Sequence, residues 1–295
     1  MTRILFQRYP RLRGRVPFEA LVDLPTPVEE HRGVWVKRDD LAGGGELRKL
    51  EFFRPARDLL AWGPEGSDWL RALARRRKAR FVTYPQRRTE HSRCNAPHIP
   101  GDHCRDPLTF GLRMLLELPR VVGGGTALAP PGGSDPVTTL GFVNAALELA
   151  GQAARGECPL PDAVFVPLAT CGAAAGLALG FGLAGLDVAV HAVRVAAPVA
   201  ARARNLFALA TQCAWLLDER PRLCRVAVER DFYGGSGTVT PEGRAAREFF
   251  RPLDLDLCHD AKAAACLLAR RPLFRTPLLW LASGTAGGGS AARIS

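Results

Sequence analysis

The pattern of apolar and polar positions in the second half of the chain is that of alternating strands and helices, as in an α/β protein. Continuous apolar runs over 162–170 and 187–196 predict buried strands, and the small residues of 171–185 predict a helix between them. A strand, a tight turn, a helix and a second strand make a βαβ unit, whose strands are parallel and whose crossover is right-handed. The pattern therefore predicts an α/β fold built on a parallel sheet.

Helix starts and further strands extend this pattern in both directions. Asp135 before Pro136, and Thr240 before Pro241, each combine a favourable N-cap with a proline at the first helical position. Residues 47–53 predict a short helix that ends or kinks near Pro55. We also expect helices over 136–154, 199–217, 240–250 and 260–270, and strands within 33–41, 78–84, 224–229 and 277–283.

Residues 84–107 show neither the spacing of apolar residues expected of a helix nor that expected of a strand. They are rich in proline and poor in aliphatic side chains, so they predict a loop. A shifted reading frame in GC-rich DNA would produce the same composition, and the chain would then lack a βα unit here. The segment contains five possible zinc ligands: His91, Cys94, His98, His103 and Cys104. Their spacing matches no established zinc motif, so we expect no metal site.

Composition limits the class of protein. The chain has 295 residues and is 47% hydrophobic, which suits one large or two smaller lobes. No run of eighteen apolar residues occurs, so no membrane span is expected, and the N-terminus lacks the apolar core of a signal peptide. We therefore expect a cytoplasmic protein whose eight cysteines are reduced. The net charge of +11 comes mostly from arginine, so lysine chemistry has few candidates.

A glycine run at 42–52, "AGGGELRKLEF", feeds one of the predicted helices. Such a turn usually presents backbone N–H groups to an anion. The first charged side chain at this turn is Glu46, which is itself an anion. The turn therefore combines an anion-binding backbone with an acidic side chain.

Four motifs together resemble one enzyme family. They are "VWVKRDDLAGGGELRKLEF", "GGSDPVTTLGFVNAALELA", "PDAVFVPLATCGAAAGLALGF" and "TPEGRAAREFF", in this order. They resemble the pyridoxal-phosphate (PLP) enzymes of the tryptophan-synthase-β-like fold, and within them D-cysteine desulfhydrase and 1-aminocyclopropane-1-carboxylate (ACC) deaminase. The resemblance implies a two-lobe α/β fold, with 1–52 and 124–295 in the large lobe and 53–123 in a small, incomplete one.

The resemblance also implies where the cofactor chemistry would lie. The family motif reads Gly-Gly-Asn-Lys-x-Arg-Lys-Leu-Glu, and its first lysine holds PLP as an imine. Aligned on "RKLE", that lysine becomes Glu46 and the preceding Asn becomes Gly45. A carboxylate cannot form an imine. Lys49 is the nearest amine, and an ion-paired lysine is the alternative interpretation of it.

Other positions implied by the resemblance match only in part. Thr89 and His91 align with the motif beneath the substrate carboxylate, while Thr170 and Gly172 align with the phosphate loop. Three further positions that carry a tyrosine, a tyrosine and a threonine in the family are Ser236, His259 and Ala282. Scaffold residues match and chemistry residues do not, which predicts an impaired member of the family.

Several functional alternatives stay open at this point. An active PLP enzyme could use Lys49, or the chain could hold a small amino acid or small anion noncovalently at Thr170 and Gly172. The basic stretch 71–80 with Arg87 and Arg88 would suit nucleic acid, but a solvated helix face is the simpler interpretation. Cys171 at a predicted helix start would need a base such as His191 to act as a nucleophile, and we interpret it as a packing residue. The resemblance implies a homodimer.

Overall fold

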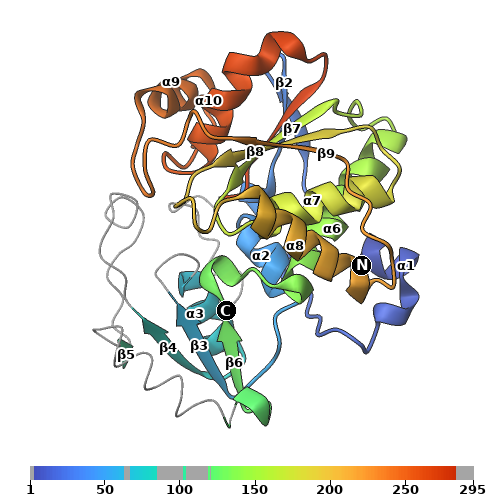
Figure 1. The fold of residues 1–295 in the computed structure, drawn as a ribbon, viewed down its shortest axis with the longest axis vertical. Coiled ribbons are helices and arrows are strands. Elements are labelled where there is room, and N and C mark those ends of the chain that lie inside the picture. The colour runs from blue at the N-terminus through green and yellow to red at the C-terminus, as the bar shows by residue number, and fades with distance from the viewer. Residues whose placement is uncertain (1–2, 63–66, 85–101, 104–118, 120, 284–295) are drawn as a thin grey trace.

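Two parallel sheets organise the chain (Figure 1). The computed structural model describes residues 3–62, 67–84, 102–103, 119 and 121–283. Within these residues, the larger sheet has six strands in the order β1-β2-β10-β7-β8-β9, and the smaller sheet has four in the order β5-β4-β3-β6. Adjacent strands are parallel except β1 and β2, which form an antiparallel pair.

The larger sheet contains β1 (Val28–His31), β2 (Val34–Lys37), β7 (Ala163–Leu168), β8 (Ala189–Arg194), β9 (Arg225–Glu229) and β10 (Pro277–Trp280). Its helices are α1 (Ile4–Arg8), α2 (Gly45–Leu50), α6 (Pro136–Ala154), α7 (Gly172–Leu183), α8 (Ala203–Leu216), α9 (Pro241–Phe249) and α10 (Asp260–Arg270). Short 3-10 turns lie at Pro10–Leu12, Asp39–Ala42, Pro131–Gly133 and Arg271–Leu273.

Hydrophobic clusters cover both faces of this sheet. Helices α6, α7 and α8 bury their apolar side chains against one face, and α9 and α10 pack on the other. Every residue of β7 is buried, which explains why its sequence is continuously apolar rather than alternating. The βαβ unit predicted over 162–196 is confirmed, because β7 pairs with β8 in parallel through α7.

The smaller sheet contains β3 (Asp58–Trp62), β4 (Arg80–Tyr84), β5 (Asp102–His103) and β6 (Thr126–Ala129), with α3 (Ser67–Arg76) beside it. Strand β3 was not among the predicted elements, and β5 lies inside the segment predicted to be a loop. Strand β6 pairs with β3, although its residues fall within the large lobe as predicted from the sequence. Strand pairing therefore extends the small lobe to Ala129, and the completeness of that lobe stays a prediction.

Helix caps confirm the sequence signals. The Asp135 side chain accepts hydrogen bonds from the backbone N–H of Val137 and Thr138, and the Thr138 hydroxyl accepts one from the Asp135 N–H. This reciprocal pair is a capping box. Thr240 caps α9 by accepting a hydrogen bond from the N–H of Gly243. The helix predicted over 47–53 begins earlier, at Gly45, and ends at Leu50, well before Pro55.

No helix in the described part of the chain combines the length and apolar character needed to cross a bilayer.

Candidate functional site

Helix α2 lies between the two sheets and begins at the glycine run (Figure 1). Gly43 and Gly44 have φ angles of 91° and 82°, which only glycine adopts readily. The N–H of Gly45 donates a hydrogen bond of 2.7 Å to the carbonyl of Ala282, two residues after the end of β10. A Cβ on Gly45 would stand 2.3 Å from the ring of Phe142 on α6. The glycines are thus required by the turn and by this close approach.

Glu46 and Lys49 form an ion pair on the first turn of α2. The Lys49 Nζ lies 3.1 Å from a carboxylate oxygen of Glu46 and donates a hydrogen bond of 2.7 Å to the carbonyl of Gly132. Lys49 is 5% exposed, whereas the Glu46 side chain is 32% exposed. Lys49 is therefore a buried, ion-paired amine and not an exposed one.

Thr170 and Gly172 lie beside this pair. The Thr170 hydroxyl is 2.7 Å from the Ser134 hydroxyl, and a Cβ on Gly172 would stand 2.5 Å from that same Ser134 oxygen. The same Cβ would lie 3.5 Å from Cε of Lys49. The fold thus gathers the polar cup, by which we mean Glu46, Lys49, Gly132, Ser134, Thr170 and Gly172.

Backbone groups at the start of α7 complete the polar cup. Cys171 precedes the helix with a φ of 71°, and no side chain caps the helix there. The first N–H groups of a helix lack intrahelical partners and carry a partial positive charge. Together with Lys49 and the Ser134 and Thr170 hydroxyls, they can bind an anionic oxygen.

The other lysines of the chain are held elsewhere. Lys37 Nζ donates to the carbonyl of Thr26 and to the side chains of Glu148 and Gln152. Lys262 Nζ donates to two backbone carbonyls after β9, and Lys78 is exposed after α3. Lys49 is therefore the only lysine in the polar cup, a conclusion that covers every lysine of the sequence because all of them are described.

A buried network of ion pairs anchors helix α2 in the fold. Arg48 binds Asp39 at 2.6 Å and Glu148 at 3.0 Å, and Lys37 binds Glu148 at 2.7 Å. Trp280 of β10 donates to Asp39 at 2.7 Å. All of these charged side chains are at most 3% exposed.

Protonation in this network follows from burial and pairing. Burial alone would raise the pKa of Glu148, but Arg48 and Lys37 outweigh it and lower that pKa to about 2. Burial lowers the pKa of Lys37, and the neighbouring Glu148 and Asp39 only partly offset this. Burial also disfavours the charge on Arg48, yet Asp39 and Glu148 hold its pKa above the usual value. The Arg48–Glu148 pair at the centre of the network is therefore charged at neutral pH.

The sequence alone did not indicate that Asp260, the first residue of α10, belongs to the site. Its carboxyl oxygens accept hydrogen bonds from the N–H groups of Ala282 and Ser283, at 3.1 and 3.0 Å. Burial raises its pKa well above the usual value, and the Asp256 carboxylate raises it further. A buried carboxyl thus stands behind Ala282, the position that aligns with the family's threonine. Only the packing of α10 on β10 reveals it.

Two further aligned positions are placed differently. His259 lies before α10, where its ring nitrogen Nδ1 is 2.9 Å from the Asp256 carboxylate. Ser236 is exposed in the loop before α9. Thr89, His91 and the zinc candidates Cys94, His98 and Cys104 lie outside the described residues, as does the side chain of His103. Among the described residues, no group of three or more His, Cys, Asp or Glu side chains is arranged to hold a metal ion.

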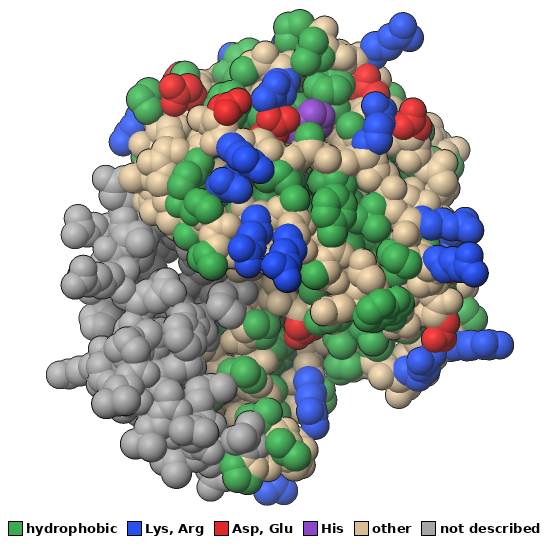
Figure 2. Space-filling view, viewed as in Figure 1, with side chains coloured by type: hydrophobic (Ala, Val, Ile, Leu, Met, Phe, Trp, Pro, Cys, Tyr) green, Lys and Arg blue, Asp and Glu red, His purple; other side chains and the backbone are tan. Residues whose placement is uncertain are grey.

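The basic stretch 71–80 is engaged within the fold. Arg71 stacks over Phe81 with its guanidinium 5.4 Å from the ring centroid, and Arg76 and Arg77 both pair with Glu19 at 2.8 Å. On the face shown in Figure 2, lysine and arginine side chains stand in ones and twos among hydrophobic and acidic ones. These arginines of the stretch are engaged within the protein, and the face in Figure 2 offers nucleic acid no continuous basic surface.

Cys171 and His191 do not meet as a nucleophile and base. The Cys171 Sγ donates to the carbonyl of Ala200 at 3.3 Å, within the apolar cluster of α6 to α8. His191 Nδ1 is 2.8 Å from Glu229, and its ring stacks on Phe165, which belongs to the cluster on the other face of the sheet. Burial raises the pKa of Cys171, which fits a packing residue.

Comparison with known proteins identifies the family. The chain is 31% identical to nocardicin C-9' epimerase of Nocardia uniformis subsp. tsuyamanensis over 292 residues, which cover 86% of this chain and 88% of that protein. The chain belongs to the fold-type II PLP enzymes. D-cysteine desulfhydrase of Klebsiella pneumoniae (strain 342) is 27% identical to it over 300 residues, or 88% of each protein. No protein-family profile matches the sequence.

Solved structures of this PLP family share the fold. An ACC deaminase homologue superposes with a TM-score of 0.74 at 22% identity over the whole of both chains. The processed form of threonine deaminase isoform 2 from Solanum lycopersicum superposes with a TM-score of 0.60 at 15% identity, over 100% of this chain and 93% of the other. At these identities the superpositions establish the two-lobe fold alone, and this confirms the predicted fold class.

The polar cup does not fit PLP held through a lysine imine. Glu46 occupies the position aligned with the family lysine, and the one amine present, on Lys49, is bound to Glu46 and to the Gly132 carbonyl. The Ser134 hydroxyl already covers the side of Gly172 where a Cβ would stand. The cup keeps groups that bind an anion but offers no free amine to an aldehyde.

Proposed function

We propose that this member of the PLP family binds a small anionic ligand noncovalently in the polar cup and is impaired in the reactions that the names of its relatives describe. The ligand is a small amino acid or another small anion that bears a carboxylate or a phosphate. By the same resemblance, we propose that it works in the cytoplasm as a homodimer. Its ancestral reaction would be an elimination or deamination of a small amino acid.

The observation that carries this proposal is the ion pair between Glu46 and Lys49. A carboxylate cannot condense with an aldehyde, and it repels an anionic cofactor in a partly desolvated site. An ammonium held at 3.1 Å by a carboxylate and at 2.7 Å by a carbonyl is a charge for binding rather than a nucleophile. The groups that remain in the cup support binding and not covalent chemistry.

A second candidate is an active PLP enzyme that uses Lys49. The burial of Lys49 in the polar cup, beside Thr170 and Gly172, favours it, because no other lysine of the chain reaches this place. For this candidate the ion pair with Glu46 must open and the amine must lose its proton.

The two candidates differ in their need for an aldehyde. The test compares pyridoxal 5'-phosphate with pyridoxine 5'-phosphate, whose hydroxymethyl group replaces the aldehyde. We expect both compounds to raise the unfolding midpoint equally, with about 2.7 kcal/mol of stabilisation at 100 times Kd. Borohydride should leave no cofactor mass on any peptide. A visible absorbance band with the aldehyde alone, and cofactor mass on Lys49 after borohydride, would establish the second candidate instead.

Matched lysine variants locate the binding. Lys49→Met should abolish the stabilisation by both compounds, and Lys78→Met, which changes an exposed lysine, should retain it. Absence of stabilisation of the unchanged protein by either compound, by inorganic phosphate and by small amino acids would contradict ligand binding at the cup.

A further inference from the structure

A cavity lies between the two sheets, next to the loop that carries Gly132 and Ser134 of the polar cup. Its volume is about 410 Å³, within the range of small-molecule sites. Its walls come from β6, from the chain after α2 and from the start of α6, with Pro17 from the N-terminal segment. The two sheets therefore build it jointly, and no residue of the polar cup lines it.

Most of the lining is apolar. Phe52, Phe53 and Val137 contribute from the side of the larger sheet, and Ala127 and Leu128 from β6. Leu128 is 39% exposed, so its side chain is open to a ligand. An apolar group of a ligand would gain free energy by covering these side chains.

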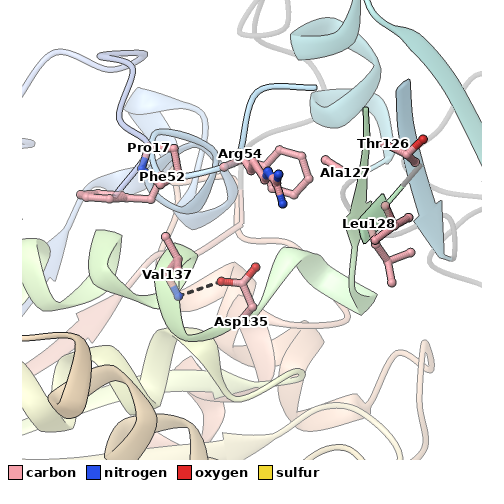
Figure 3. Close-up of a pocket in the computed structure, with 10 residues that line it drawn as sticks. Pro17, Phe52, Arg54, Thr126, Ala127, Leu128, Asp135 and Val137 are labelled. Carbon is pink, nitrogen blue, oxygen red and sulfur yellow. Dashed lines mark hydrogen bonds between the residues drawn. The ribbon is translucent and has the colours of Figure 1, made fainter. Parts of the chain in front are cut away.

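Two opposite charges face this apolar space. Figure 3 shows Arg54 and Asp135 on opposite walls, with their polar ends directed into the space between them. Only one Asp135 oxygen, Oδ1, accepts the hydrogen bonds that cap α6, from the N–H groups of Val137 and Thr138 at 2.8 Å each. Within the described residues, no hydrogen bond is recorded for the other oxygen, Oδ2, or for the Arg54 guanidinium.

We propose that this cavity binds a free amino acid with an apolar side chain, as a zwitterion. The carboxylate would pair with Arg54, the ammonium would pair with Oδ2 of Asp135, and the side chain would lie against Phe52, Val137 and Leu128. Arg54 is exposed and Asp135 is half-buried, so a ligand with only one charge would forgo one of the two charge-assisted contacts. A zwitterion satisfies both.

The loop between β6 and α6 separates this cavity from the polar cup. The Gly132 carbonyl and the Ser134 hydroxyl face the cup, whereas Asp135 lines the cavity. The two sites are therefore distinct, and binding in the cavity does not depend on the function proposed for the cup.

Calorimetric titration of the full chain tests the proposal with leucine and phenylalanine as ligands. The controls are 4-methylpentanoate and 3-methylbutylamine, which carry only one charge of leucine each. We expect leucine or phenylalanine to bind, and each control to bind at least about tenfold more weakly, because it loses a charge-assisted contact. Equal binding of either control would overturn the assignment of a zwitterion, and no binding of any amino acid would overturn the site.

Variants place the ligand. Arg54→Met should weaken leucine binding at least about tenfold, whereas Arg244→Met, at an exposed arginine of α9, should not change it. Asp135→Asn should weaken leucine binding similarly with little loss of stability, because asparagine is an equally good N-cap.

Leu128→Trp should block the cavity, while Leu160→Trp, at a leucine that is 43% exposed elsewhere, should leave binding intact. Binding that is indifferent to Arg54→Met and to Leu128→Trp would refute the proposal.

Discussion

Replacement of Glu46 by glutamine should tighten the binding of an anion to the polar cup. The substitution keeps the size of the side chain and removes the one negative charge of the cup. Lys49 lies 3.1 Å from Glu46, so an anion bound to Lys49 would lie about 5 Å from that carboxylate. At this separation, two unit charges repel by about 3 kcal/mol at an effective dielectric constant of 20 and by about 1 kcal/mol in water.

The exposure of Glu46 decides between these limits. Because its side chain is 32% exposed, solvent screens the repulsion, and about 1–2 kcal/mol is the appropriate estimate. Glu46→Gln should therefore lower the Kd for pyridoxine 5'-phosphate by about 5- to 30-fold. The helix should lose about 0.3–1 kcal/mol of stability, since Glu46 is the acidic residue of the first turn of α2.

Calorimetry at low salt measures the effect, with Glu242→Gln as the matched control. Glu242 is the acidic residue in the first turn of α9, far from the cup in sequence, so it reports any general effect of a lost helix-start charge. An unchanged or weaker affinity of Glu46→Gln would show that the anion does not bind next to this carboxylate. The reasoning about the polar cup would then be wrong.

Further expectations concern the scaffold. Glu148→Gln should lower the free energy of unfolding in urea by about 3–5 kcal/mol, because it removes the ion-pair partner of buried Lys37, although Arg48 keeps Asp39; exposed Glu157→Gln should change it little. The pKa of Glu148 in the folded protein is about 2, which is below its value in the unfolded chain. Ionised Glu148 therefore contributes about 3 kcal/mol to the free energy of unfolding above about pH 4.5, and this contribution is lost as the pH falls towards 2. The free energy of unfolding should depend less on pH in this range in Glu148→Gln than in the unchanged protein. Gly45→Ala should cost about 1–3 kcal/mol in urea unfolding through its clash with Phe142, and Phe142→Leu should recover part of this. Burial raises the pKa of Cys266 to about 12, so its thiol should resist alkylation of the folded protein at pH 8; rapid modification detected by mass spectrometry would contradict its burial.

Local signals in the sequence predicted five of the six strands of the larger sheet, and only β1 was missed. The apolar run of β7, the small residues of α7 and the two proline-marked helix starts depend on neighbours within one or two turns. The resemblance named Glu46 and Lys49 from one motif and Thr170 and Gly172 from another, and the structure brings Lys49 close to Gly172. The chemistry of these residues could be argued before their positions were known.

Long-range pairing limited the rest of the prediction. The strand β3 is a short apolar run among arginines and prolines, and its period alone cannot separate strand from loop. The pairing of β6 with β3 joins segments almost seventy residues apart, so no local pattern indicates it. Asp260 reaches the site through the packing of α10 on β10. The partners of Arg48 are likewise distant in the sequence: Asp39, just after β2, is 9 residues away, and Glu148 on α6 is 100 residues away.

The contacts that hold α2 in place explain how the fold can persist without its family's imine lysine. Arg48 anchors the helix to Asp39 and Glu148, and the Gly45 N–H joins it to β10. On α6, a Cβ at Gly141 would stand 2.1 Å from the Arg48 carbonyl, so the two helices touch through backbone. None of these contacts uses the side chain at position 46, which faces the polar cup. An acidic residue there even favours the helix dipole. Selection on folding therefore does not oppose the replacement of lysine by glutamate, and membership of the family is compatible with loss of its chemistry.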